Sequence, residues 1–305
     1  MAFFIYGHQG FLLSIINDAK RWAKVELSLL LIMIRKIFAA LVIVFIITTT
    51  HAATVDTIPI YSKAMDKSFN CVVIKPLSYK KRKQEYPVVY LLHGYGGSYS
   101  NWINLVPGLK KYADDYQFLV VCPDGGYSSW YLNSPLDSSF RFETYISTEV
   151  PAWIDAHYNT VKNRNGRAIT GLSMGGHGGL FLGFRHAAIF GACGSMSGGV
   201  DMRPFPKNWE ISKRIGDSAH YAMNWKEYSV ITVIEQKPKD SLAIIIDCGT
   251  EDFFYTVNRA LHEKMLALKI PHDYIERPGK HDWKYWANAV KYQLLFFREY
   301  FEKMK

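Results

Sequence analysis

A serine in the pattern Gly-x-Ser-x-Gly, residues 171–175, is the strongest chemical feature of this chain of 305 residues. An apolar stretch typical of a strand, 166–170, precedes it, and a glycine-rich stretch, 176–179, follows it. This context is typical of a nucleophile elbow, in which a strand turns sharply into a helix and small flanking residues let the two pass closely. The same pattern also occurs in glycine-rich turns whose serine does no chemistry. Ser173 is therefore a candidate nucleophile whose partners must be found downstream.

An acid and a base should follow such a serine, in that order, each in a loop after a strand. The β-branched run at 242–246 indicates a buried strand, and Asp252 lies in the loop after it. A last short strand is predicted over 273–277, and His281 comes soon after it. We therefore predict Asp252 as the acid and His281 as the base of a catalytic triad.

Three neighbouring residues compete for these two roles. Glu251 is adjacent to Asp252, but adjacent side chains in a tight loop point apart, so only one of them can reach the imidazole. His262 falls inside an amphipathic helical segment, and His272 precedes the last predicted strand. These positions favour structural roles for both histidines.

Two backbone amides are candidates for an oxyanion hole. The residue after the nucleophile supplies one donor in this kind of site, and a loop after an early strand supplies the other. Here the first is the N–H of Met174. The apolar strand predicted over 87–92 runs into the glycine-rich loop 93–98, which makes the N–H of Tyr95 the second candidate.

Apolar runs alternate with helical segments along most of the chain, which predicts an α/β fold with a mostly parallel, doubly wound sheet. With 49% hydrophobic residues, residues 53–305 are long enough to build a single catalytic domain around one core. Strands are expected near 70–75, 87–92, 118–122, 167–171, 191–196, 242–247 and 272–277. Helices are expected near 143–158, 176–187, 256–268 and 283–302.

Residues 1–52 differ from the rest of the chain. Arg35 and Lys36 are followed by an apolar run and then by small residues, which is the pattern of a cleavable export signal cut after Ala52 or Ala53. The complete signal begins at Met33, so we interpret Met33 as the initiator and residues 1–32 as an upstream extension. A membrane-anchored N-terminus is the alternative. The apolar run is short for a span of roughly 20 residues, and export predicts a secreted or periplasmic protein without a membrane partner.

The charge pattern gives little support to nucleic-acid binding. Residues 1–52 carry five Lys/Arg and two Asp/Glu, so their removal lowers the net charge from +9 to +6. The remaining basic residues are scattered, apart from 80–83, which we expect in a solvated turn. The four cysteines fall in or beside predicted strands and favour buried thiols. No spacing typical of a metal, dinucleotide or phosphate-loop site occurs, so no cofactor is expected.

Aromatic residues are predicted near the substrate. The segment 200–232 interrupts the α/β alternation and is interpreted as a small cap over the site. The candidate substrate-binding residues lie in this segment or on loops after predicted strands, where ligands of α/β sheets bind: Trp102, Trp130, Tyr131, Trp209 and Trp283. Their rings suit an acyl chain or the face of a sugar. Filling the space between cap and core is the alternative role for each of them.

Several segments of this chain, including the Ser173 motif and the loops of Asp252 and His281, resemble the putative-esterase family of α/β-hydrolases. This family includes tributyrin esterases, S-formylglutathione hydrolases, feruloyl esterases and mycolyltransferases. The likeness covers most of residues 55–303, and its closest branch is the bacterial tributyrin esterases. It is carried by residues 90–94 with 96–98, 143–146, 169–176, 248–253 and 279–283. The resemblance implies the same nucleophile, acid and base. One departure is Lys280, which stands where relatives often have glycine.

Together these features predict an exported serine carboxylesterase that acts on short-chain acyl esters, or on acyl or feruloyl groups of carbohydrates. The resemblance leaves two other activities open, acyl transfer of the mycolyltransferase type and thioester hydrolysis of the S-formylglutathione type. A non-catalytic glycan-binding scaffold is disfavoured because no member of the triad is missing. The expected partner is a small-molecule or glycan ester, and a homo-oligomer is compatible with the sequence.

Overall fold

The computed structural model describes residues 6–47, 53–79, 84–236 and 242–304. The chain divides into two compact units, residues 1–51 and 52–305. In the first unit, Met33 lies within one long helix, α1 (Tyr6–Ile47). Of the two predicted cleavage positions, Ala52 lies outside the described residues and Ala53 lies within them; the basic turn at 80–83 also lies outside. Among the described residues, no helix combines the length and the apolarity needed to span a bilayer.

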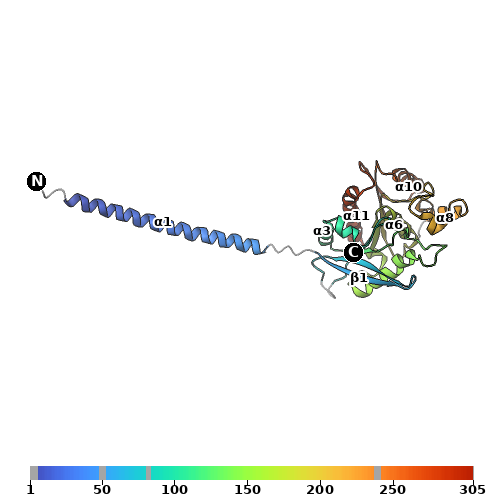
Figure 1. The fold of residues 1–305 in the computed structure, drawn as a ribbon, viewed down its shortest axis with the longest axis horizontal. Coiled ribbons are helices and arrows are strands. Elements are labelled where there is room, and N and C mark those ends of the chain that lie inside the picture. The colour runs from blue at the N-terminus through green and yellow to red at the C-terminus, as the bar shows by residue number, and fades with distance from the viewer. Residues whose placement is uncertain (1–5, 48–52, 80–83, 237–241, 305) are drawn as a thin grey trace. The chain divides into compact units, whose positions relative to one another are not determined.

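A single sheet organises the second unit (Figure 1). Its described strands are β1 (Thr54–Ser62), β2 (Lys67–Lys75), β3 (Val88–Leu92), β4 (Leu119–Pro123), β5 (Arg167–Gly171), β6 (Ala192–Met196), β7 (Ala243–Gly249) and β8 (Asp273–Arg277). Their order across the sheet is β1-β2-β4-β3-β5-β6-β7-β8. β1 and β2 run antiparallel to their neighbours, and the other strands are parallel. This mostly parallel sheet confirms the α/β-hydrolase fold expected from the sequence.

The sequence did not indicate the edge strand β1. Pro59 interrupts its apolar pattern, and most of its residues are exposed or half-buried. Proline lacks the N–H that a central strand needs, but an edge strand tolerates it because one side of the strand has no ladder to complete. The remaining strands lie within a few residues of their predicted positions.

Helices cover both faces of the sheet. In chain order they are α2 (Asn101–Leu105), α3 (Leu109–Tyr116), α4 (Phe142–Thr144), α5 (Val150–His157), α6 (Met174–Arg185), α7 (Ile211–Ile215), α8 (Ala222–Glu227), α9 (Val230–Val233), α10 (Tyr255–Ala267) and α11 (Trp283–Lys303). A π-helical turn, Tyr145–Glu149, joins α4 to α5, and a short 3-10 turn, Arg164–Gly166, precedes β5. Helices α5, α6, α10 and α11 lie at or within a few residues of the predicted helical ranges, whereas α1, α2, α3 and the short helices of the insertion were not predicted. The insertion at 200–232 forms the short helices α7 and α8 and most of α9.

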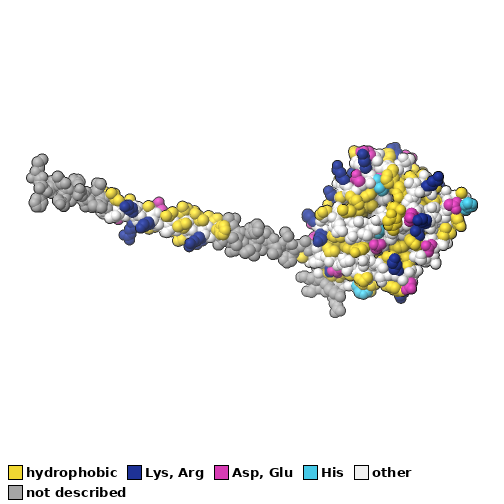
Figure 2. Space-filling view, in the orientation of Figure 1, with side chains coloured by type: hydrophobic (Ala, Val, Ile, Leu, Met, Phe, Trp, Pro, Cys, Tyr) yellow, Lys and Arg dark blue, Asp and Glu magenta, His cyan; other side chains and the backbone are white. Residues whose placement is uncertain are grey.

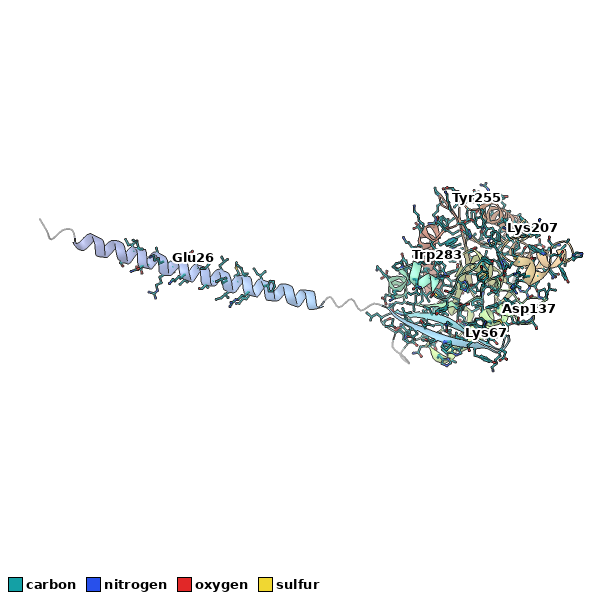
Figure 3. All side chains as sticks on the ribbon, in the orientation of Figure 1. Glu26, Lys67, Asp137, Lys207, Tyr255 and Trp283 are labelled. Atoms are coloured by element: carbon teal, nitrogen blue, oxygen red, sulfur yellow. The ribbon has the colours of Figure 1, made fainter. Side chains whose placement is uncertain are left out.

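Alternate residues of the central strands point to opposite faces and build two apolar layers. On one face, Tyr90 and Val121 belong to the layer covered by α5, α6 and α10. On the other face, Leu91 and Val120 pack with α2, α3 and α11, and Figure 1 shows α3 and α11 side by side. Figure 3 shows that side chains occupy the spaces around the ribbon of the second unit. Each buried aliphatic side chain contributes about 1.5–3 kcal/mol, so these layers hold the strand ends in place.

The visible surface of the second unit has no dominant charge. Figure 2 shows basic and acidic side chains interspersed with hydrophobic ones on this face. All four cysteines, Cys71, Cys122, Cys193 and Cys248, are free and buried.

Helix α6 packs unusually close to the sheet. A Cβ atom added to Gly179 would lie 2.4 Å from the carbonyl oxygen of Gly194 in β6. Real Cβ atoms do not approach backbone that closely, so a side chain here requires the helix or the strand to shift. Because α6 begins directly after Ser173, its distance from the sheet decides where that serine lies.

We expect Gly179→Ala to lower the free energy of unfolding by about 1–3 kcal/mol or more, because the added methyl overpacks a backbone contact. Gly108→Ala is the matched control, since its Cβ would lie 3.5 Å from the nearest atom, on the ring of Tyr112. Urea unfolding measures both. Equal stability of the two variants would contradict the close packing of α6.

Candidate active site

Ser173 lies in a strained turn between β5 and α6. Its backbone has φ 55° and ψ −118°, a conformation that non-glycine residues rarely adopt. The turn is held by Ser173 N–H, which donates to the carbonyl of Met196 at 2.9 Å. Cβ atoms at Gly171 or Gly175 would lie 2.6 Å from backbone oxygens. Any larger residue at these two positions would clash with the backbone, so the motif requires glycine at both. The turn places Ser173 at the end of the strand.

His281 joins Ser173 to Asp252 through hydrogen bonds. Its Nε2 lies 2.9 Å from Ser173 Oγ, and its Nδ1 lies 3.0 and 2.8 Å from the two carboxylate oxygens of Asp252. A carboxylate only accepts hydrogen bonds, so Nδ1 carries the proton and Nε2 is free to accept from the serine hydroxyl. The Asp252 side chain is fully buried. This arrangement can withdraw the serine proton during a nucleophilic attack.

The competing residues lie elsewhere. Glu251 is about half exposed and lies 3.9 Å from the ammonium group of Lys280. His262 and His272 bond to each other at 2.8 Å, and the His262 ring stacks on Tyr274. None of the three contacts Ser173 in the structure.

The peptide between Gly94 and Tyr95 has a fixed orientation. The Gly94 carbonyl accepts hydrogen bonds from His93 Nδ1 at 2.8 Å and from Gly97 N–H at 3.0 Å. His93 Nε2 in turn accepts from the N–H of Gly125 at 2.7 Å, which places the ring proton on Nδ1. Burial lowers the pKa of His93 and keeps this ring neutral. In a trans peptide the C=O and the next N–H point in opposite directions, so the Tyr95 N–H points away from His93.

The two candidate oxyanion donors are free to bind a ligand. Met174 is the first residue of α6, where the backbone N–H has no acceptor within the helix. Within the described part of the chain, neither this amide nor that of Tyr95 donates to another group. His93 was not identified as a functional residue from the sequence. Its position next to Gly94 was the available signal.

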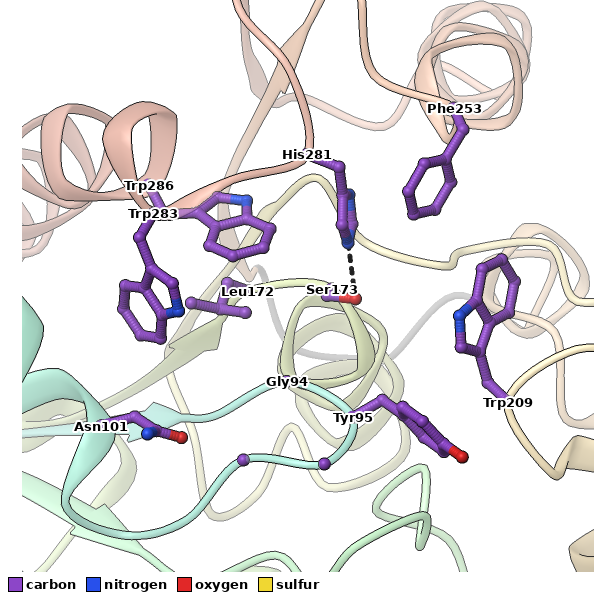
Figure 4. Close-up of a pocket in the computed structure, with 12 residues that line it drawn as sticks. Gly94, Tyr95, Asn101, Leu172, Ser173, Trp209, Phe253, His281, Trp283 and Trp286 are labelled. Carbon is purple, nitrogen blue, oxygen red and sulfur yellow. Dashed lines mark hydrogen bonds between the residues drawn. The ribbon is translucent and has the colours of Figure 1, made fainter.

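A cavity of about 350 Å³ opens beside Ser173 (Figure 4). Trp283, Trp286 and Leu172 lie on one side of the serine, and Trp209 and Phe253 lie on the other. The rest of the lining consists of Gly94, Tyr95, Gly96, Gly97, Asn101 and His281. The cavity thus has two apolar sides with the serine hydroxyl between them, which suits the two halves of an ester.

The structure divides the predicted substrate residues into two groups. Trp209, from the insertion, and Trp283, at the start of α11, line the cavity. Trp102, Trp130 and Tyr131 do not line it and are buried. Their loops do end near the site, but their side chains turn inward, because that is where their polar atoms find hydrogen-bond acceptors.

Each of the three inward-facing residues supports a residue of the site. Trp102 donates from Nε1 to the carbonyl of Leu92, and its ring packs edge-on against Trp283. Trp130 donates from Nε1 to the carbonyl of Trp209 at 3.2 Å. Tyr131 donates from its hydroxyl to the carbonyl of His93 at 2.9 Å. The structure thus places all three side chains behind the cavity lining, and their part in substrate binding stays a prediction.

Phe253 and Trp286 line the cavity but were not predicted. Phe253 stacks on Trp209 with ring centres 5.5 Å apart, and Trp286 packs edge-on against His281 at 4.8 Å. The sequence signals were Phe253 next to Asp252 and Trp286 one helical turn after Trp283. Among the described residues, no three His, Cys, Asp or Glu side chains group as ligands for a metal ion.

The sequence of residues 62–297 matches the family described as putative esterase. The chain belongs to this family. Esterase Rv1288 of Mycobacterium tuberculosis is 28% identical over 236 residues, which cover 68% of this chain and 51% of that protein. This family member thus spans about half the length of that relative. An acetyl esterase from Caldicellulosiruptor saccharolyticus is 26% identical over 255 residues, covering 76% of this chain and 95% of that protein.

Solved structures share the fold of this family member. A ferulic acid esterase superposes with a TM-score of 0.72 at 27% identity and covers 83% of this chain and 100% of its own. An S-formylglutathione hydrolase from Agrobacterium tumefaciens superposes with a TM-score of 0.70 at 20% identity. The superposition covers 83% of this chain and 98% of that chain. The finer resemblance to tributyrin esterases stays a prediction.

His177 is a further buried histidine close to the site. It lies one turn after Ser173 in α6, where its ring stacks on Phe181 and meets Trp130 edge-on. Burial lowers the pKa of His177 to about 3. The folded protein therefore holds this side chain neutral, while the unfolded chain takes up a proton near pH 6.5. Its contribution to stability is complete above that pH and is lost as the pH falls.

As the pH falls from 7 to 5, protonation of His177 in the unfolded chain should lower the free energy of unfolding by about 2 kcal/mol. Below pH 6.5 the free energy of unfolding changes with a slope that approaches about 1.4 kcal/mol per pH unit for one such group. His177→Leu should remove that part of the pH dependence. His220→Leu, whose side chain is 82% exposed, is the matched control and should keep it. Urea unfolding at both pH values measures the difference, and an unchanged slope in His177→Leu would contradict this interpretation.

Proposed function

We propose that this protein is a serine hydrolase that cleaves carboxylic esters, with Ser173 as nucleophile, His281 as base and Asp252 as acid. The single observation that carries the proposal is the hydrogen-bonded chain from Ser173 Oγ through His281 to Asp252, which opens into a cavity. The strained turn at Ser173 and membership of the putative esterase family support it.

The reaction begins when a substrate carbonyl lies against Ser173 Oγ. A serine hydroxyl is a weak nucleophile, so His281 Nε2 takes its proton as the oxygen attacks the carbonyl carbon. Asp252 holds the imidazole in the tautomer that makes Nε2 the acceptor and stabilises the imidazolium that forms. His281 then gives the proton to the departing alkoxide, which leaves as an alcohol. The acyl group remains on Ser173, and water, activated by the same imidazole, releases it as an acid.

The negative oxygen of each tetrahedral intermediate needs donors that are already oriented. We assign this role to the N–H groups of Met174 and Tyr95. Both amides lack a partner among the described residues, and the Gly94 carbonyl on the Tyr95 peptide is held in the opposite direction. Loss of one such donor typically lowers kcat by about 10²–10³-fold.

The size of the cavity favours small ester groups. A volume of about 350 Å³ is near the lower end of ligand sites, and each of its two aromatic sides fits a short acyl chain or a single ring. We propose short-chain acyl esters, or acyl and feruloyl groups on carbohydrates, as substrates. The acetyl esterase and ferulic acid esterase among the similar proteins support this choice.

We also propose that the esterase unit is exported after cleavage near residue 52. The support is the basic, apolar and small-residue pattern of residues 35–52. Ala53 is buried, and its backbone nitrogen donates to the Asp114 carboxylate at 2.8 Å. Cleavage after Ala52 would place a new α-ammonium group at this carboxylate, whereas cleavage after Ala53 would remove a packed residue.

Ser173→Ala is expected to lower kcat by about 10⁴-fold or more on p-nitrophenyl acetate, butyrate and octanoate, and on methyl ferulate and acetylated xylan. Asp252→Asn should lower kcat about 10⁴-fold, because the neutral amide cannot stabilise the imidazolium and can donate to Nδ1, which favours the wrong tautomer. Glu251→Gln, the adjacent carboxylate, is the matched control and should stay within about twofold of the parent. Initial rates, with and without an added sugar acceptor, separate hydrolysis from acyl transfer. Full activity in Ser173→Ala would overturn the proposal.

His93→Ala should lower kcat by about 10–100-fold, because the Tyr95 N–H loses the support that orients it. His220→Ala is the control, because it is the same change on a histidine whose side chain is 82% exposed and outside the site. Steady-state kinetics on p-nitrophenyl butyrate measure both variants. A kcat for His93→Ala within twofold of the parent would show that this ring does not orient the peptide.

A further inference from the structure

A second buried carboxylate lies beneath the loop that carries His281. Asp247 is in β7, five residues before Asp252, and its side chain is fully buried. It accepts a hydrogen bond from the Tyr285 hydroxyl and pairs with the guanidinium of Arg277. The proposed reaction assigns no role to Asp247. An isolated buried charge is expensive, so these two donors are what allow a carboxylate here.

Tyr285 links this carboxylate to the loop between β8 and α11. A Cβ atom on Gly279 would lie 2.2 Å from Cδ2 of Tyr285, so the glycine backbone rests directly on the ring. Gly279 has φ 153°, a backbone conformation in which a residue with a side chain would be strained. The Tyr285 backbone N–H also donates to Asp282, which caps α11 immediately after His281. The ring and the backbone of Tyr285 therefore contact the chain on both sides of His281.

The loops that carry the acid and the base are joined on the other side. Thr250 N–H donates to the Arg277 carbonyl, and Glu251 N–H donates to the Gly279 carbonyl, each at 3.0 Å. A Cβ on Gly249 would lie 2.3 Å from the Gly279 oxygen. The Gly279 backbone is thus enclosed between the Asp252 loop and the Tyr285 ring, and the freedom of that ring is limited by its bond to Asp247.

We propose that Asp247 and Tyr285 are positioning residues for His281. The Asp247 carboxylate holds the Tyr285 hydroxyl, the Tyr285 ring supports Gly279, and Gly279 sets where the His281 imidazole meets Ser173. This inference rests on the proposed function, because it concerns the geometry of that reaction. Neither residue is among those that line the cavity beside Ser173, so we expect their effect to be on the proton transfer and not on substrate binding.

Tyr285→Phe tests this role because it removes the hydroxyl and keeps the ring under Gly279. We expect kcat on p-nitrophenyl butyrate to fall about 10–100-fold, since small misplacements of reacting groups are costly, while KM stays within twofold. Tyr292→Phe is the matched control: it is the same change in the same helix, on a ring that also lies under Arg277 but has no bond to Asp247. It should retain the parent kcat.

Active-site titration with a fluorophosphonate separates positioning from folding. A low kcat per titrated serine in Tyr285→Phe, with an unchanged melting temperature, supports the inference. A parental kcat per titrated serine overturns it, whether or not the variant is less stable. Ester hydrolysis that survives Ser173→Ala overturns instead the proposed function on which the inference rests.

Discussion

The close approach of helix α6 to the sheet is the constraint on which the site depends. Ser173 lies at the single point where β5 must reverse into this helix, and its left-handed backbone is strained by the turn. Only glycine fits at 171, 175 and 179, where backbone oxygens occupy the space of a Cβ. The packing of the two apolar layers supplies the free energy that holds the strained serine in place. A stable core is therefore a precondition of the chemistry.

Buried polar side chains then fix the groups around the serine. His93 orients one peptide, and Asp247 with Tyr285 supports one loop. Each makes its hydrogen bonds away from solvent, where an unpartnered polar group would be costly. The same bonds that offset burial also limit how far the Tyr95 amide and the His281 ring can move. Structural and functional demands are thus met by the same contacts.

The aromatic walls of the cavity have two layers. Trp209, Phe253, Trp283 and Trp286 line the space beside Ser173, and behind them lie buried aromatic residues that do not reach it. Trp130 is bonded to the backbone of Trp209, and Trp102 packs against Trp283. The inner layer is backed by a second one, and together they define the size of the cavity.

The sequence by itself determined most of the fold, because apolar periodicity and glycine spacing reflect local packing requirements. It also placed Ser173, Asp252 and His281 in loops after three strands, now seen as β5, β7 and β8, and parallel strands bring their carboxyl ends to one edge. Strand β1 was not predicted because an edge strand is only partly buried and its apolar pattern is weak. The tertiary structure alone decided that Trp102, Trp130 and Tyr131 turn inward and that Phe253 and Trp286 face the cavity. It also decided which carboxylate meets the imidazole. The direction of a loop side chain depends on partners distant in the sequence, and local patterns do not contain that information.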